Sequence, residues 1–314
     1  MQTNSFNESL NMILNESRNY SMMIENTYHI NEVSLAECIR KIDFKKIFKF
    51  IFDKFIDIIK ALWDRFKAAY YAFTRKSTLI KKYRKKLENI DWDVQIDIDR
   101  SIFTNLDSST NITMYKMSLN EEYSTLIGEL DNLSNCRNLN DIQDNILRIK
   151  NNMENLDDFL NQERGIALGY RGSISKEDFA KEALLYFKPT KIIPSYSPVS
   201  PDETKMYVKD YFELKNAEKA ITKDQSTLDS TAKSMSSKFN SLNIHKYLPD
   251  QEINNEISST FVEIVREYCN RVQGTCNIYA QLFSIKLDVF KMYKEQQVQV
   301  LTKIILESIK EGKM

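Results

Sequence analysis

The sequence predicts a mainly α-helical protein: a helical bundle with a long antiparallel helical hairpin and one small β hairpin. The first observation is that 314 residues contain only 6 glycines and 5 prolines, so turns are few and elements are long. The second is that apolar residues recur at intervals of three and four over several long stretches, which is the helical period. The third is that strict alternation of polar and apolar residues is confined to one short segment, which predicts a strand.

The chain divides by composition into five parts. An Asn- and Glu-rich start precedes an aromatic and basic segment, and four of the five prolines fall between Pro189 and Pro201. The predicted parts are a loosely structured N-terminal arm (1–40), an amphipathic basic helical unit (41–90), a helical domain with the small β hairpin (91–188), a Pro-rich linker (189–200) and the long antiparallel helical hairpin (201–314).

Charge is segregated along the chain although its formal total is zero. Residues 41–88 carry 15 basic and 5 acidic side chains, whereas residues 89–163 carry 5 basic and 15 acidic ones. Such asymmetry indicates either a surface that meets a partner or two segments that meet each other. We expect residues 75–86 to lie near the acidic faces of 89–163; if they do not, the basic unit is free to meet a phosphate-bearing partner.

The segment 43–73 predicts an amphipathic helix with a broad aromatic face opposite a charged one. Packing in the protein's own core or in an oligomer is the preferred interpretation. A membrane interface and a partner's groove are the alternatives. No run of eighteen apolar residues occurs, so no transmembrane helix is expected. The candidate interaction or membrane surface consists of Phe48, Ile51, Phe52, Phe55, Ile59, Leu62, Trp63 and Phe66.

A basic run follows this helix and forms a candidate basic patch. Its side chains could contact phosphates, with Tyr83 stacking on a base. The preferred interpretation is a solvated helix face, or a segment whose charge is neutralised by the acidic strand that follows, because short basic runs are common. The patch consists of Arg75, Lys76, Lys81, Lys82, Arg84, Lys85 and Lys86.

Residues 91–99 alternate Asp with apolar residues and predict a half-buried strand, for which residues 111–117 are the expected hairpin partner. The strand's four carboxylates would share one face. They lack the EF-hand spacing of a calcium site, so a solvated or neutralised edge is preferred.

The remaining segments predict helices. Residues 118–133, 140–162 and 175–187 have helical periodicity, and Ser118 and Ser175 are the expected caps of the first and the last. Ser200-Pro201-Asp202-Glu203 opens a helix to about residue 242, whose apolar seam is interrupted by Glu218 and Gln225. A last helix follows Pro249 and nearly reaches the C-terminus, so the two should pack antiparallel.

No pattern of reactive residues predicts catalysis. The four cysteines (Cys38, Cys136, Cys269 and Cys276) form no CxxC pair, and only His29 and His245 could join them in a metal site. We therefore assign no catalytic residue, no metal and no cofactor from the sequence.

Three stretches resemble one group of viral proteins. They are the aromatic-basic helix with Lys82-Tyr83-Arg84-Lys85-Lys86, the stretch Gly172-Ser173-Ile174-Ser175-Lys176-Glu177-Asp178-Phe179, and residues 275–288. The resemblance is to putative virion structural proteins of tailed phages that infect low-GC Gram-positive bacteria. The resemblance implies a non-enzymatic virion component, made in the host cytoplasm, that contacts other virion proteins or copies of itself. It carries over no defined site. A membrane-surface protein that uses helix 43–73 during genome delivery is the alternative function, and an enzyme of unrecognised type is a third.

Overall fold

The structure is a computed structural model of the chain. For some helix and strand residues only the backbone is described: 69–77, 97–98, 195–197 and 255–259. The predicted N-terminal arm, with His29 and Cys38, lies outside the described residues, as do most of the predicted helices 140–162 and 175–187. The residues described are 43–98, 112, 115–138, 140–145, 147–149, 151, 158, 161–162, 165, 172–175, 178, 195–247 and 255–314.

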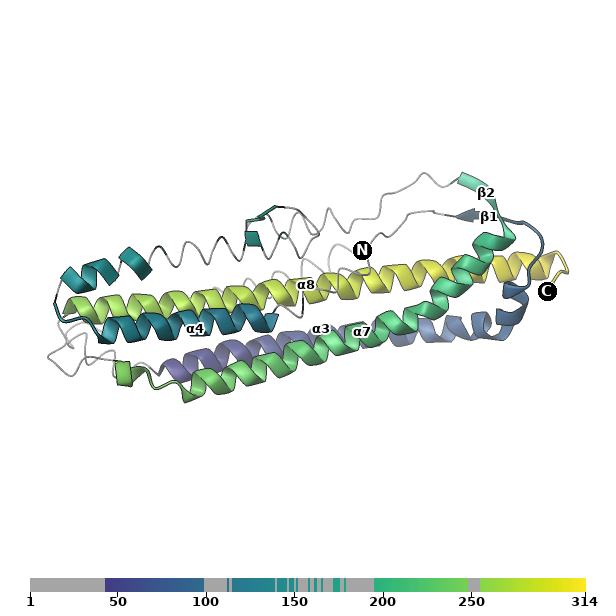
Figure 1. The fold of residues 1–314 in the computed structure, drawn as a ribbon. Coiled ribbons are helices and arrows are strands. Elements are labelled where there is room, and N and C mark those ends of the chain that lie inside the picture. Colours follow the sequence, from purple (N-terminus) through teal and green to yellow (C-terminus); the bar gives the residue numbers. More distant parts are fainter. Residues whose placement is uncertain are drawn as a thin grey trace. The chain divides into compact units, whose positions relative to one another are not determined.

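The described chain is mainly helical, with one small antiparallel sheet, so the predicted fold class is confirmed (Figure 1). The helix α8 alone has 56 residues and is about 84 Å long at 1.5 Å per residue. The principal elements, in chain order, are α3 (Phe44–Glu88), β1 (Val94–Ile98), α4 (Tyr115–Ser134), β2 (Ser195–Val199), α7 (Pro201–Ser241), the short 3₁₀ helix η2 (Ile244–Tyr247) and α8 (Asn255–Lys310).

The chain forms two compact units, and α3, α7 and α8 contribute residues to both. Unit 1 comprises Met1–Ile59, Thr110–Ala180 and Ser226–Phe283. Unit 2 comprises Lys60–Ser109, Lys181–Gln225 and Ser284–Met314.

The helix α3 begins and ends at caps that the sequence supplies. The Asp43 carboxylate accepts a hydrogen bond from the Lys46 backbone N–H at 3.1 Å, and this bond lowers the pKa of Asp43. At the other end the Asn89 side-chain amide donates to the Lys85 carbonyl at 2.7 Å. Lys85 and Lys86 occupy the last turn, where cations favour the negative end of the helix dipole.

Aromatic side chains make several direct ring contacts in the core of unit 1, among many buried aliphatic side chains. Phe48 stacks on Phe239 with ring centroids 4.1 Å apart, and Phe52 contacts the same ring at 5.8 Å. Phe55 packs on Tyr115, whose ring contacts Tyr279 at 5.0 Å. These contacts join α3, α4, α7 and α8, so the broad aromatic face predicted for residues 43–73 holds the four helices together.

The sheet of unit 2 differs from the predicted hairpin. The strand β1 pairs antiparallel with β2, from Val94 opposite Val199 to Ile98 opposite Ser195. The predicted partner, 111–117, is therefore wrong, because Tyr115–Met117 form the first turn of α4. The predicted linker 189–200 contributes β2, and Pro198 fits there because each strand of a two-stranded sheet is an edge strand.

Helix starts were predicted with mixed success. Ser200 caps α7: its hydroxyl accepts from the Glu203 backbone N–H at 3.2 Å, while the Glu203 carboxylate accepts from the Ser200 N–H at 3.1 Å. Ser118 is not a cap, because α4 begins at Tyr115 and Ser118 is buried within it. No helix in the described part of the chain is long and apolar enough to cross a membrane.

Candidate functional site

The aromatic face of α3 lies in the protein's interior. Phe48 is 1 % exposed, Phe52 0 % and Phe55 3 %, and only Trp63 of the predicted set is half-buried. The periodicity of the sequence identified this face correctly but could not show what covers it. The predicted interaction or membrane surface is thus occupied by internal packing: Phe48, Ile51, Phe52, Phe55, Ile59, Leu62 and Phe66 are all buried.

The basic patch, in contrast, is exposed on the C-terminal end of α3 in unit 2. Ile80 and Leu87 are fully buried and Tyr83 is half-buried, so these three positions turn inward. The basic residues lie on the side of the helix that faces solvent. Arg75 and Lys76 belong to the helix, but their side chains are outside the description. The exposed members are Lys81, Lys82, Arg84, Lys85 and Lys86.

Local partners engage only part of this patch. Arg84 pairs with Glu88, with Nε 2.8 Å from Oε1, and its guanidinium lies 4.0 Å from the centroid of the Phe212 ring. The ammonium groups of Lys82 and Lys86 lie 5.2 and 6.0 Å from the centroid of the Tyr83 ring. The Tyr83 ring, which was considered as a surface on which a base could stack, is therefore half-buried and already approached by two cations.

The expected neutralisation of the patch by the acidic strand is not seen among the described side chains. Asp91 and Asp93 are exposed, and no ion pair within the described residues joins either of them to Lys81, Lys82, Lys85 or Lys86. The Asp97 side chain and Asp99 lie outside the described residues. Of the described acids, Glu88 alone forms an ion pair with the patch, through Arg84.

A buried carboxyl group in unit 1 is a feature that the sequence did not reveal. Glu122 of α4 is fully buried, and the Thr275 hydroxyl of α8 donates a hydrogen bond to its Oε1. Its Oε2 has no hydrogen-bond partner among the described residues. Burial raises the pKa of Glu122 to about 8, while the hydrogen bond from Thr275 and the charge of Arg271 act in the opposite direction. Glu122 is therefore largely protonated at neutral pH.

Hydroxyl and thiol groups extend this buried polar cluster along the contact between α4 and α8. Tyr115 Oη and Cys276 Sγ share a hydrogen bond at 3.3 Å, and Ser118 Oγ lies 3.5 Å from Tyr279 Oη. Burial is the main cause that raises the pKa of Cys276 to about 12 and that of Tyr115 well above its usual range. Cys276 therefore remains a thiol at neutral pH, which is unsuited to nucleophilic attack.

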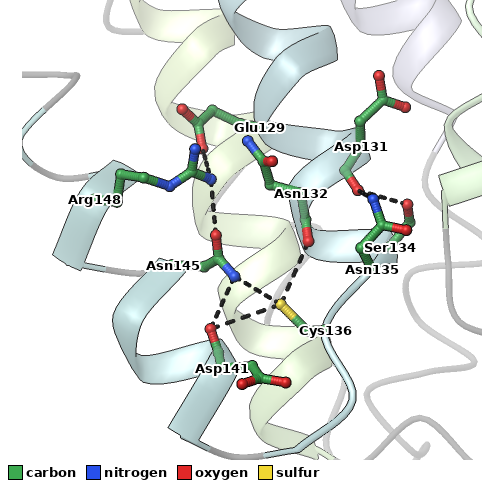
Figure 2. Close-up of polar contacts among 9 residues, drawn as sticks. All are labelled: Glu129, Asp131, Asn132, Ser134, Asn135, Cys136, Asp141, Asn145 and Arg148. Atoms are coloured by element: carbon green, nitrogen blue, oxygen red, sulfur yellow. Dashed lines mark hydrogen bonds and ion pairs between the residues drawn. The ribbon is translucent and has the colours of Figure 1, made fainter.

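A second polar cluster joins the end of α4 to the helical residues that follow (Figure 2). The buried Glu129 carboxylate accepts a hydrogen bond from Arg148 Nη2 at 3.2 Å, and the same Arg148 nitrogen donates to Asn145 Oδ1 at 2.7 Å. Asn145 Nδ2 in turn donates to Cys136 Sγ at 2.9 Å and to the Asp141 carbonyl at 2.8 Å.

This second cluster stabilises a turn and offers no reactive group. Burial raises the pKa of Cys136, so its sulfur is held as a thiol. Asn138 caps the following helical segment, since its Oδ1 accepts from the Asp141 backbone N–H at 3.0 Å. Among the described residues, no group of three His, Cys, Asp or Glu side chains is arranged to hold a metal ion.

Charged and polar pairs cross the contact between α7 and α8 in unit 2. Lys286 forms a buried ion pair with Asp224, and Tyr293 Oη donates to Asp210 at 3.3 Å. The order of these two pairs shows that the helices run antiparallel here, as predicted. Burial and the nearby Lys81 lower the pKa of Lys294 to about 8, and Glu218, which interrupts the predicted seam, opposes that shift.

Comparison of the chain with known proteins found no relative. A scan against family models, a search of curated proteins and a search of solved structures each found no match.

Proposed function

We propose that this protein is a non-enzymatic structural or internal component of a phage particle that acts through protein–protein contacts. The observation that carries the proposal is the long-helix scaffold. Three helices of 45, 41 and 56 residues make up most of the described chain, and their apolar faces are packed inside. Such helices offer long, rigid outer faces to a partner, which suits a role in assembly. The phage setting itself rests on the resemblance of the three sequence stretches.

The contacts in this proposal lie on outer helix faces and not on the aromatic face of α3. That face is buried against Phe239, Tyr115 and other residues of the same chain. Several large apolar side chains remain exposed on other elements and are the candidates for such contacts. They are Met117 (63 %), Leu147, Met206, Leu306 and Ile309.

Mass spectrometry of purified phage particles tests the proposal. We expect peptides of the chain in gradient-purified particles, in an amount that stays constant relative to the major capsid protein after repeated purification. Cross-linking within the particle should then join exposed lysines of this chain to another virion protein or to a second copy. Absence of the chain from purified particles would contradict the proposal.

Membrane-surface binding through helix 43–73 is the weaker candidate. It would require the buried face of α3 to leave the interior, because Phe48, Phe52 and Phe55 are already covered. Flotation with anionic liposomes tests it: we expect the folded protein to show no flotation that depends on these side chains. Flotation that is abolished by Phe48→Glu together with Phe55→Glu, in a variant that still folds, would favour this candidate instead.

A further inference from the structure

The basic patch of unit 2 is a dense cluster of positive charge that has no part in the proposed function. It is defined here as Lys81, Lys82, Arg84, Lys85 and Lys86. Successive residues of an α-helix are turned by about 100°, so these five positions spread over the whole solvent-facing side of α3. Their five charges fall within about 8 Å of helix axis at 1.5 Å per residue. Like charges at this density repel one another unless anions accompany them.

Four of the five cations have no acidic partner within the described residues. Arg84 alone is paired, with Glu88, whereas Lys81, Lys82, Lys85 and Lys86 contact aromatic rings or face solvent. Two exposed lysines of α7 in the same unit differ in this respect, because Lys205 pairs with Asp202 and Lys209 with Glu213. The patch is therefore a local excess of positive charge in a chain whose total charge is zero.

We infer that this patch binds the phosphate backbone of a nucleic acid without regard to base sequence. Four flexible ammonium groups on a convex helix suit the regularly spaced phosphates of a duplex, and their binding releases condensed counterions. Base readout is not expected, because Tyr83 is half-buried beneath Lys82 and Lys86. No residue of α3 between 78 and 88 is an exposed large apolar side chain, so the patch has no anchor for insertion into a lipid bilayer.

This inference goes beyond the proposed function, because a purified protein can bind nucleic acid whether or not it occurs in a particle. Fluorescence anisotropy with a labelled duplex of about 20 base pairs, titrated between about 50 and 200 mM salt, measures it directly. We expect binding that weakens steeply with salt and that is equal for two duplexes of unrelated sequence.

The decisive variant replaces the four unpaired lysines: Lys81→Gln, Lys82→Gln, Lys85→Gln and Lys86→Gln. The matched control is Lys205→Gln, Lys209→Gln, Lys215→Gln and Lys219→Gln, which removes the same charge from exposed positions of α7 in the same unit. Glutamine retains helix propensity, and circular dichroism will verify that both variants fold. We expect the patch variant to lose about tenfold or more in affinity and its salt slope to fall by about 3, and the control to change little.

Three results would overturn the inference. They are no binding by the natural protein at the lowest salt, an unchanged affinity in the patch variant, and an equal loss in the control. A separate binding experiment uses vesicles of phosphatidylglycerol and phosphatidylcholine. Patch-dependent binding to these vesicles without binding to the duplex would assign the patch to a membrane surface and would also overturn the inference.

Discussion

The two units differ in the side chains buried between their helices, although α3, α7 and α8 contribute residues to both. In unit 1, the interior contains the ring contacts of Phe48 with Phe239 and of Phe55 with Tyr115, and a buried carboxyl group that is largely protonated at neutral pH. In unit 2, the contact between α7 and α8 contains the buried ion pair of Asp224 with Lys286. The difference shows that one long helix can change the character of its buried face along its length.

This contrast has opposite consequences for pH. A buried acid with a raised pKa stabilises the folded state below the pKa of the unfolded chain, and that stability is lost as the pH rises. A buried lysine with a lowered pKa behaves in the opposite way, since the folded state binds its proton less tightly than the unfolded chain does. Glu122 in unit 1 and Lys294 in unit 2 are these two groups. Variants of each unit can therefore test whether the two interiors differ in this way.

The largest effect is expected from Phe239→Ala in unit 1. The ring is 1 % exposed and contacts Phe48, Phe52 and Tyr123, so its removal leaves a large cavity. We expect a loss of about 4 kcal/mol in the free energy of unfolding, measured by urea denaturation. Phe212→Ala, at a half-buried ring of unit 2 under Arg84, is the control and should cost clearly less. Equal losses would show that the aromatic contacts of unit 1 have no special weight.

The next effect concerns the ion pair of unit 2. Lys286→Ala leaves the Asp224 carboxylate buried without its partner, and we expect a loss of about 3 kcal/mol. Replacing both residues, with Asp224→Leu and Lys286→Met, should restore most of that stability, because a buried ion pair is often no better than an apolar pair. Urea denaturation of the two variants checks this expectation. A double variant as unstable as the single one would mean that the pair itself stabilises unit 2.

A smaller effect is the pH dependence that Glu122 gives to unit 1. Its pKa of about 8 in the folded protein exceeds the ordinary value of 4.5, so its contribution to stability decreases as the pH rises from 4.5 to about 8. Glu122→Gln keeps the shape without the titration. Between pH 6 and pH 8 we expect the natural protein to lose about 2 kcal/mol relative to this variant, in urea titrations at both pH values. Parallel pH profiles for the two proteins would contradict a protonated Glu122.

The smallest effect is the reverse pH dependence that Lys294 gives to unit 2. Its pKa of about 8 lies below the ordinary value of 10.5, so stability rises as the pH increases from 8 towards 10.5. Relative to Lys294→Gln, we expect the natural protein to gain about 1 kcal/mol between pH 7 and pH 9, after allowance for solvent screening. Thermal unfolding at the two pH values provides the measurement. A relative loss over that range would contradict the depressed pKa.

The parts of the fold that the sequence predicted are those with local causes. The start of α7 follows from the reciprocal hydrogen bonds of Ser200 and Glu203, which lie three residues apart. The aromatic face of α3 follows from its helical period. The basic patch was visible as a run of charges, and its exposure agrees with the interpretation as a solvated helix face.

The parts that were missed depend on contacts between distant residues. The segment Ser195–Val199 contains two serines and a proline, and only its pairing with β1 makes it a strand. Glu122 follows another glutamate in a polar helix and resembled a surface acid. Its burial depends on Thr275, which lies 153 residues further along the chain. Periodicity reports which face is apolar, but it does not report the partner that covers that face.

The aromatic face of α3 belongs to the protein's own core and is not an accessible surface. Hydroxyl-radical footprinting of the native protein with mass spectrometry tests it most directly, because it reports the accessibility of single side chains. We predict that Phe48, Phe52 and Phe55 are strongly protected relative to the urea-unfolded chain, while the exposed Met117 and Met206 are oxidised in both states. Oxidation of the three phenylalanines at the rate of the unfolded chain would show that this face is accessible in the folded protein.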